Sequence, residues 1–210
     1  DALLSQVLMA TTYPSDVTLA VKWAYAHRDL KGDEAVKAVQ DQPWDPSVQS
    51  LVAFPQVLAM LGEKPEWVQN LGDAFLAQPN DVMDSVQFLR AKAKAAGNLA
   101  SNEQQIIAVE PAPPPPQIIV VGAPPPPTQI ITIVPANPEV IYVPQYNPTT
   151  VVVTAGYPWG YWPTPYPVYY YPYPPGAAFA TGLIWGAAIG AAWNGGHWNT
   201  NWGGGDININ

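Results

Sequence analysis

A short strand-like motif occurs three times between residues 105 and 133. The copies begin at Gln105, Gln117 and Gln129, and each continues with mostly β-branched apolar residues. Isoleucine and valine favour the pleated, half-buried surface of a β-strand. Four successive prolines follow each of the first two copies, at 113–116 and 124–127. The sequence therefore predicts a repeat of short strands joined by proline connectors.

The proline connectors restrict how these strands can pair. Four prolines favour polyproline II, at ~3.1 Å per residue, so each connector is a stiff arm of about 12 Å. A tight hairpin often needs positive φ angles, which proline cannot adopt. We therefore expect that neighbouring strands do not fold back on one another, and that each pairs with something else, such as another copy of the chain. A plain linker between two domains would explain the prolines but not the repeated strands.

Charge divides the chain into two halves. All lysines and arginines lie at or before Lys94, whereas most of the 26 prolines lie from Pro111 onward. The formal charge of -8 argues against a nucleic-acid partner. The absence of cysteine excludes disulfides, thiolate metal sites and a cysteine nucleophile. The nearly uncharged second half has the kind of surface that associates readily.

Residues 1–98 carry helical apolar periodicity and predict a small helical bundle. Asp45 is the expected N-cap of a helix that starts at Pro46, with a break or kink at Pro55 and an end at Gly62. The last helix is expected over about 80–96, ended by Gly97 and Asn98. Its predicted inward residues are Val82, Val86 and Leu89.

The sequence predicts an α+β chain in five parts. The bundle at 1–98 precedes short strands with polyproline connectors at 99–154, then a proline- and aromatic-rich extended segment at 155–175. An apolar segment at 176–193 precedes a Gly/Asn-rich tail at 194–210, whose alternating last residues indicate a terminal strand. We expect the natural chain to be processed or trimmed before Asp1 and to continue past Asn210.

The segment 176–193 has no charged residue and places small residues every four positions. Such a stripe allows close helix packing, and the length approaches that of a membrane span. No lysine or arginine flanks the segment to set an orientation. A buried glycine-zipper helix is therefore favoured over a membrane span.

Residues that could support catalysis are sparse. His27 follows a helical face and is expected at a helix end, while His197 lies in a Gly/Asn loop without metal-ligand spacing. Asp206 among asparagines is a weak calcium candidate. No phosphate-binding loop or nucleophile elbow occurs. We predict a protein that is not an enzyme, with no catalytic residue, cofactor or metal.

Several motifs resemble a bacterial family known only as a domain of unknown function, numbered thirty-three hundred. They include the segment 1–14, QPWDPSV at 42–48, LGDAFL at 71–76, SNEQQ at 101–105, VIYVP at 140–144 and the tail at 202–210. The resemblance covers nearly the whole chain. Because members of that family typically carry a secretion signal, it implies the periplasm, the outer membrane or the cell exterior. It carries over no enzymatic role.

Two functional hypotheses follow. The first is a secreted structural protein that polymerises with copies of itself into an extracellular filament or sheath by pairing strands between subunits. The second is a binding module of the envelope, with residues 176–193 associated with the outer membrane. Cell-surface glycans are a further candidate partner, because aromatic rings stack on sugars. The expected subunit-interface residues are Ile106, Ile107, Val109, Ile118, Ile119, Val121, Ile130, Ile131, Ile133, Tyr142, Trp159, Trp162, Tyr170, Gly182, Gly186 and Gly190.

Overall fold

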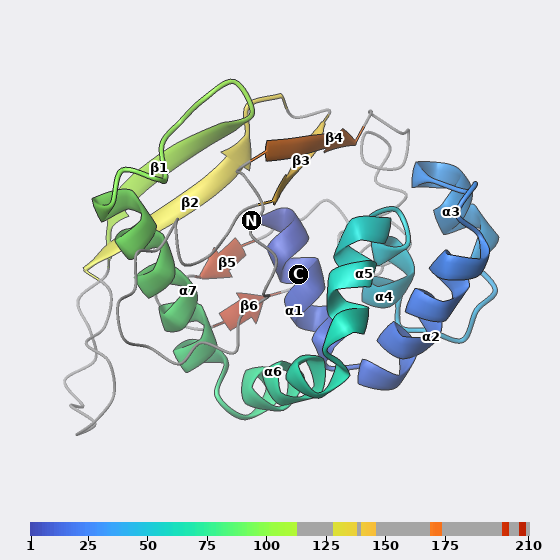
Figure 1. The fold of residues 1–210 in the computed structure, drawn as a ribbon. Coiled ribbons are helices and arrows are strands. Elements are labelled where there is room, and N and C mark those ends of the chain that lie inside the picture. The colour runs from blue at the N-terminus through green and yellow to red at the C-terminus, as the bar shows by residue number, and fades with distance from the viewer. Residues whose placement is uncertain (113–127, 138–139, 146–168, 174–198, 202–205, 209–210) are drawn as a thin grey trace. The chain divides into compact units, whose positions relative to one another are not determined.

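The computed structural model describes residues 1–112, 128–137, 140–145, 169–173, 199–201 and 206–208. Among these, helices occupy the first half and short strands the second (Figure 1). The expected α+β class is thereby confirmed. The expectations for Ile118, Ile119, Val121, Trp159, Trp162 and His197, and for the glycine stripe at 176–193, lie outside the described residues.

The helices follow one another with short connections. They are α1 (Ala2–Thr11), α2 (Pro14–Ala26), α3 (Gly32–Ala38), α4 (Pro46–Leu51), α5 (Pro55–Glu63), α6 (Pro65–Ala77) and α7 (Pro79–Ala95). The described strands are β1 (Gln105–Pro111), β2 (Gln129–Pro135), β3 (Ile141–Gln145), β4 (Tyr169–Tyr173), β5 (Asn199–Asn201) and β6 (Asp206–Asn208).

Helices α1 to α6 form the core of one compact unit. Helix α1 packs on α4 and α6, and α2 packs on α5. The buried apolar side chains of this unit come from all six helices and the turn before α5, and include Leu8, Val17, Val36, Val48, Leu51, Phe54, Leu58 and Val68. Proline opens α2, α4, α5 and α6. It suits that position because the first helical N–H has no partner inside the helix.

The expected boundaries around α4 and α5 are correct except at Gly62. The Asp45 carboxylate accepts a hydrogen bond of 2.8 Å from the Ser47 N–H, which makes Asp45 the N-cap of α4. Pro55 begins α5, so it separates two helices. Gly62, however, lies inside α5, which continues to Glu63. A Cβ there would lie 2.7 Å from a methyl carbon of Val21, so the glycine allows α2 to approach closely.

Gly72 has the tightest surroundings of the described glycines. A Cβ added to it would lie 2.0 Å from the backbone oxygen of Thr11, at the last residue of α1. The absence of a side chain at Gly72 therefore lets α6 contact the end of α1.

Helix α7 belongs with β1 to β3 in the second compact unit, although its sequence groups it with the helices before it. Gly97 ends it at a φ of 75°, and the N–H groups of Gly97 and Asn98 donate to the carbonyls of Lys94 and Ala93. This is the paired hydrogen-bond pattern of a Schellman cap. The most buried residues of α7 are Met83, Gln87, Arg90 and Ala93. The predicted inward residues Val82, Val86 and Leu89 are half-buried, so the buried face is turned by one residue from the expected one.

Strands β1 and β2 are the first and third copies of the repeat, and they pair with each other antiparallel within one chain (Figure 1). The register runs from Gln105 opposite Pro135 to Pro111 opposite Gln129. The expectation that each strand pairs outside its own chain is therefore wrong for these two copies. The long segment between them makes a tight turn unnecessary, which removes the argument against their pairing. Two further pairs, β3 with β4 and β5 with β6, form separate two-stranded sheets.

Candidate functional site

The β1–β2 pair presents two outer edges, and the register shows which residues direct their backbone groups outward. The ladder continues through hydrogen bonds from Ala112 to Thr128 and from Ala136 to Gln104. Because antiparallel pairs alternate between bonded and non-bonded, even-numbered residues bond across the pair and odd-numbered residues face outward. Pro111 and Pro135 both occupy outward positions, where their lack of an N–H costs no ladder bond.

The outer edge of β2 is closed at its centre by two side chains of α7. Gln87 accepts a hydrogen bond of 2.8 Å from the Ile131 N–H through Oε1, and its Nε2 donates to the Ile131 carbonyl at 3.3 Å. Arg90 donates to the same carbonyl through Nη1 at 2.7 Å. All three residues are buried. The Gln87 amide thus replaces the peptide group of a further strand, and no strand can add to β2 at Ile131.

The outer edge of β1 is capped at its start by the preceding turn. The Gln105 N–H donates to Asn102 Oδ1 at 3.0 Å, and the Asn102 N–H donates to the Gln105 carbonyl at 2.9 Å. The Ile107 N–H donates to the Ser101 hydroxyl oxygen at 2.9 Å. Farther along, the outward N–H and carbonyl of Val109 have no hydrogen-bond partner among the residues that the structure describes. Among the described residues, the part of this edge that lacks partners is centred on Val109.

The two faces of the pair differ in burial. Successive residues of a strand alternate between faces, so Val109 and its cross-strand partner Ile131 share one face. Ile131 is 1% exposed, whereas Val109 is 38% exposed. On the other face the paired Ile106 and Val134 are 48% and 44% exposed. Both the edge and one face of β1 therefore offer apolar surface.

The structure brings several of the expected interface residues together and separates others. Six of them lie in the β1–β2 pair: Ile106, Ile107, Val109, Ile130, Ile131 and Ile133. Tyr142 lies half-buried in β3, and Tyr170 lies in the neighbouring strand β4. Sequence reasoning missed Gln87 and Arg90. The sequence did carry a signal for them: Gln87 and Arg90 lie three residues apart on one helix face, whose other buried members, Met83 and Ala93, are apolar.

Two side chains of the helical unit, His27 and Tyr13, have polar partners within it. His27 is the C-cap of α2, as expected; its Nδ1 lies 2.9 Å from the Trp23 carbonyl oxygen, and its ring stacks on the Trp23 ring at 4.4 Å. The pKa of Tyr13 is raised by the negative charge of Asp45, by burial, by a hydrogen bond to Asp45 and by Asp16. Within the described ranges, no group of three or more His, Asp or Glu side chains could hold a metal ion. The contact of Tyr13 with Asp45 joins the residues before α2 and α4, and the contact of His27 with Trp23 lies at the end of α2.

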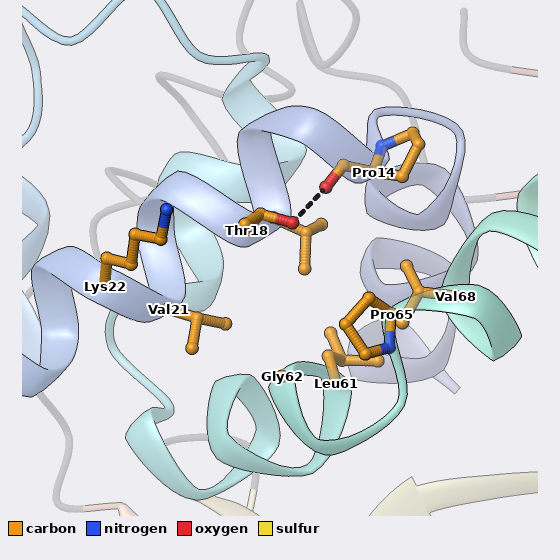
Figure 2. Close-up of a pocket in the computed structure, with 9 residues that line it drawn as sticks. Pro14, Thr18, Val21, Lys22, Leu61, Gly62, Pro65 and Val68 are labelled. Atoms are coloured by element: carbon orange, nitrogen blue, oxygen red, sulfur yellow. Dashed lines mark hydrogen bonds between the residues drawn. The ribbon is translucent and has the colours of Figure 1, made fainter.

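A pocket of about 160 Å³ lies between α2, α5 and α6 (Figure 2). Its walls are mainly apolar, and Figure 2 shows Val21, Leu61 and Pro65 around the same space. Lys22 and Thr18 are its polar members, and the Thr18 hydroxyl donates to the Pro14 carbonyl at 2.9 Å. The lining contains no carboxylate and no histidine, and most of its surface is apolar.

Comparison with known proteins agrees with the motifs of the sequence. A family model described as "Protein of unknown function (DUF3300)" matches residues 1–210. The chain belongs to this family. The expected membership is therefore confirmed, and the family description assigns no activity.

One curated relative is the "Uncharacterized protein YacH" of Escherichia coli (strain K12). It is 50% identical over an aligned length of 210, and the alignment covers 91% of this chain. The chain spans about a third of that relative's length, since the match covers 33% of it. No solved structure matches. None of the described helices is both long and apolar enough to cross a membrane.

Proposed function

We propose that this DUF3300 chain is a structural protein of the bacterial exterior or envelope that assembles with copies of itself by strand addition. The open edge at Val109 carries this proposal. An unpaired strand edge is a template for another strand, and soluble proteins usually block such edges. Here β2 is blocked by α7 and the start of β1 by Ser101 and Asn102, while no residue that the structure describes covers the edge around Val109.

The composition of the second half supports the same proposal. No lysine or arginine follows Lys94, so charge repulsion between copies is weak over most of this region. Exposed apolar residues, including Ile106 and Val134, lie on the β1–β2 pair itself. An enzymatic role is not proposed, because neither the pocket nor the described polar clusters arrange groups for bond-making chemistry.

The test is the association state of the purified protein over a wide concentration range. Sedimentation velocity and negative-stain electron microscopy should show growth from small particles to long assemblies as concentration rises. A monomer at every concentration, with no extended particles, would rule the proposal out. Fractionation of the native cells should place the protein in the periplasm, the outer membrane or the medium.

The apolar pocket of the helical unit supports a second proposal, an envelope binding module with residues 176–193 associated with the membrane. Its walls suit an apolar side chain of a protein partner. This alternative expects membrane association that resists carbonate and is lost when residues 176–193 are deleted. Complete release by carbonate would contradict it.

A further inference from the structure

The open edge of β1 has a defined set of hydrogen-bonding groups. Val109 offers one outward N–H and one outward carbonyl. Ile107 and Pro111, the outward residues on either side, offer carbonyls alone, because Ser101 holds the Ile107 N–H and proline has none. Among the described residues, the open edge thus presents three acceptors and one donor.

This pattern disfavours the pairing of β1 with a second β1. With Val109 opposite Val109 of another copy, the two residues would exchange two hydrogen bonds. On each side Ile107 of one copy would then face Pro111 of the other. The Ile107 N–H is already bonded to Ser101, and Pro111 has no N–H. Four carbonyls would remain without donors, and buried carbonyls without partners are costly. The edge therefore suits a strand that supplies N–H groups at alternate positions.

The middle copy of the repeat has the required donors. Residues 117–121 contain no proline and no charge, so each residue carries an N–H. Their pattern matches that of β1 and β2, which pair antiparallel. With Ile119 opposite Val109, the N–H groups of Val121 and Gln117 would face the carbonyls of Ile107 and Pro111. Only the carbonyls of Val121 and Gln117 would then lack donors, which is two in place of the four left by pairing β1 with β1. The side chain of Ile119 would then lie beside Val109, on the face where Ile131 is buried but Val109 is exposed.

We propose that residues 117–121 of a second copy of the chain add to β1 as an antiparallel strand centred on Val109. This inference rests on the proposed self-assembly and names the strands that carry it. The donor strand and the acceptor edge are different surfaces of one chain, so the contact is heterologous and continues from copy to copy. The closed edge of β2 at Ile131 directs growth to β1.

The experiment uses two proline variants that each remove one side of this contact. Val109→Pro removes the one N–H that the open edge of β1 offers. It leaves the ladder to β2 intact, because the Val109 N–H faces outward. Ile119→Pro removes the central donor of the incoming strand. Each variant should raise the concentration needed for assembly at least about tenfold. Val109→Thr keeps the N–H and should assemble as the parent does.

Ala108→Pro is the matched control for the position of the proline. The Ala108 N–H belongs to the bonded pair with Thr132, so this variant should lower the melting temperature, whereas Val109→Pro should not. Mixing the two proline variants tests directionality. The Ile119→Pro copy retains an edge and the Val109→Pro copy retains a strand, so the mixture should yield a one-to-one dimer that does not extend.

The outcomes separate this inference from the proposed function. If the parent assembles and both Val109→Pro and Ile119→Pro assemble equally well, the strand assignment is wrong although self-assembly stands. If the parent is monomeric at every concentration, both are wrong. If the Val109 amide of that monomer is also protected from hydrogen exchange, and Ile119→Pro abolishes the protection, residues 117–121 occupy the edge of their own chain.

Discussion

The side-chain amide of Gln87 makes two hydrogen bonds to the backbone of Ile131, accepting at 2.8 Å from its N–H and donating at 3.3 Å to its carbonyl. The side chain of α7 thus occupies the position of a neighbouring strand. Arg90 adds a third bond to the same residue. This arrangement makes α7 part of the sheet unit and closes one of its two edges.

Substitution of Gln87 by Leu should lower the free energy of unfolding of this unit by about 1–3 kcal/mol, because the Ile131 N–H would stay buried without an acceptor. Urea unfolding monitored by circular dichroism, together with the exchange rate of the Ile131 amide, measures the effect. Ser85→Ala on the exposed side of α7 is the control and should change stability by less than about 0.5 kcal/mol. Equal effects of the two substitutions would contradict the role given to Gln87.

Gln87 and Arg90 should be energetically coupled through the carbonyl that they share. The double variant Gln87→Leu with Arg90→Met should lose more stability than the sum of the single losses, by about 0.5–3 kcal/mol, since each single variant leaves the buried Ile131 carbonyl one donor and the double variant leaves it none. A double-mutant cycle from urea unfolding gives this difference. Strict additivity would show that the two side chains act independently.

Gly72→Ala should destabilise the helical unit, because the added Cβ would overlap the Thr11 carbonyl at 2.0 Å and backbone atoms cannot move aside easily. Overpacking of this kind costs about 1–3 kcal/mol, more than the gain of up to about 1 kcal/mol in helix propensity. Gly62→Ala is the comparison, since its Cβ would meet a Val21 methyl carbon at 2.7 Å and a side chain can shift. Thermal melting should rank Gly72→Ala as the less stable variant; the reverse order would contradict the packing of α6 on α1.

Asp84 should reduce stability at neutral pH. Burial and the nearby charge of Asp81 raise the pKa of Asp84, so the folded state holds its proton more tightly than the unfolded state does. Stability therefore falls as pH rises from about 3.9, the usual aspartate value, through the raised folded pKa. Asp84→Asn should melt about 1–3 °C higher at pH 7 and show no advantage at pH 3.

Asp81→Asn is the control for Asp84→Asn, because it removes an equal charge from the same helix turn region without the expected gain in stability. Asp81 lies in the first turn of α7, where a negative charge favours the helix, so its removal should not stabilise the protein at pH 7. A lower melting temperature for Asp84→Asn at pH 7, or an advantage that persists at pH 3, would contradict the stated cause of the shift.

The sequence by itself determined the local elements of this protein. Helix boundaries were set by single residues: proline in the first turn, the cap at Asp45 and the glycine at Gly97. Each acts on the backbone within a few residues, so the sequence alone predicts where these helices begin and end. The repeated Gln-Ile-Ile pattern likewise specified β1 and β2 as strands.

Only the tertiary structure decided which of these elements meet. Apolar periodicity placed Val82, Val86 and Leu89 inward, but α7 packs beside a strand edge whose backbone needs polar partners, so Gln87 and Arg90 are buried instead. The strand motif also could not show that its first and third copies pair within one chain. The three copies share nearly the same apolar pattern, so the pattern alone does not select which copy pairs with which. The register pairs residues as far apart as Gln105 and Pro135, and edge closure depends on contacts 41 and 44 positions apart, neither of which local periodicity encodes.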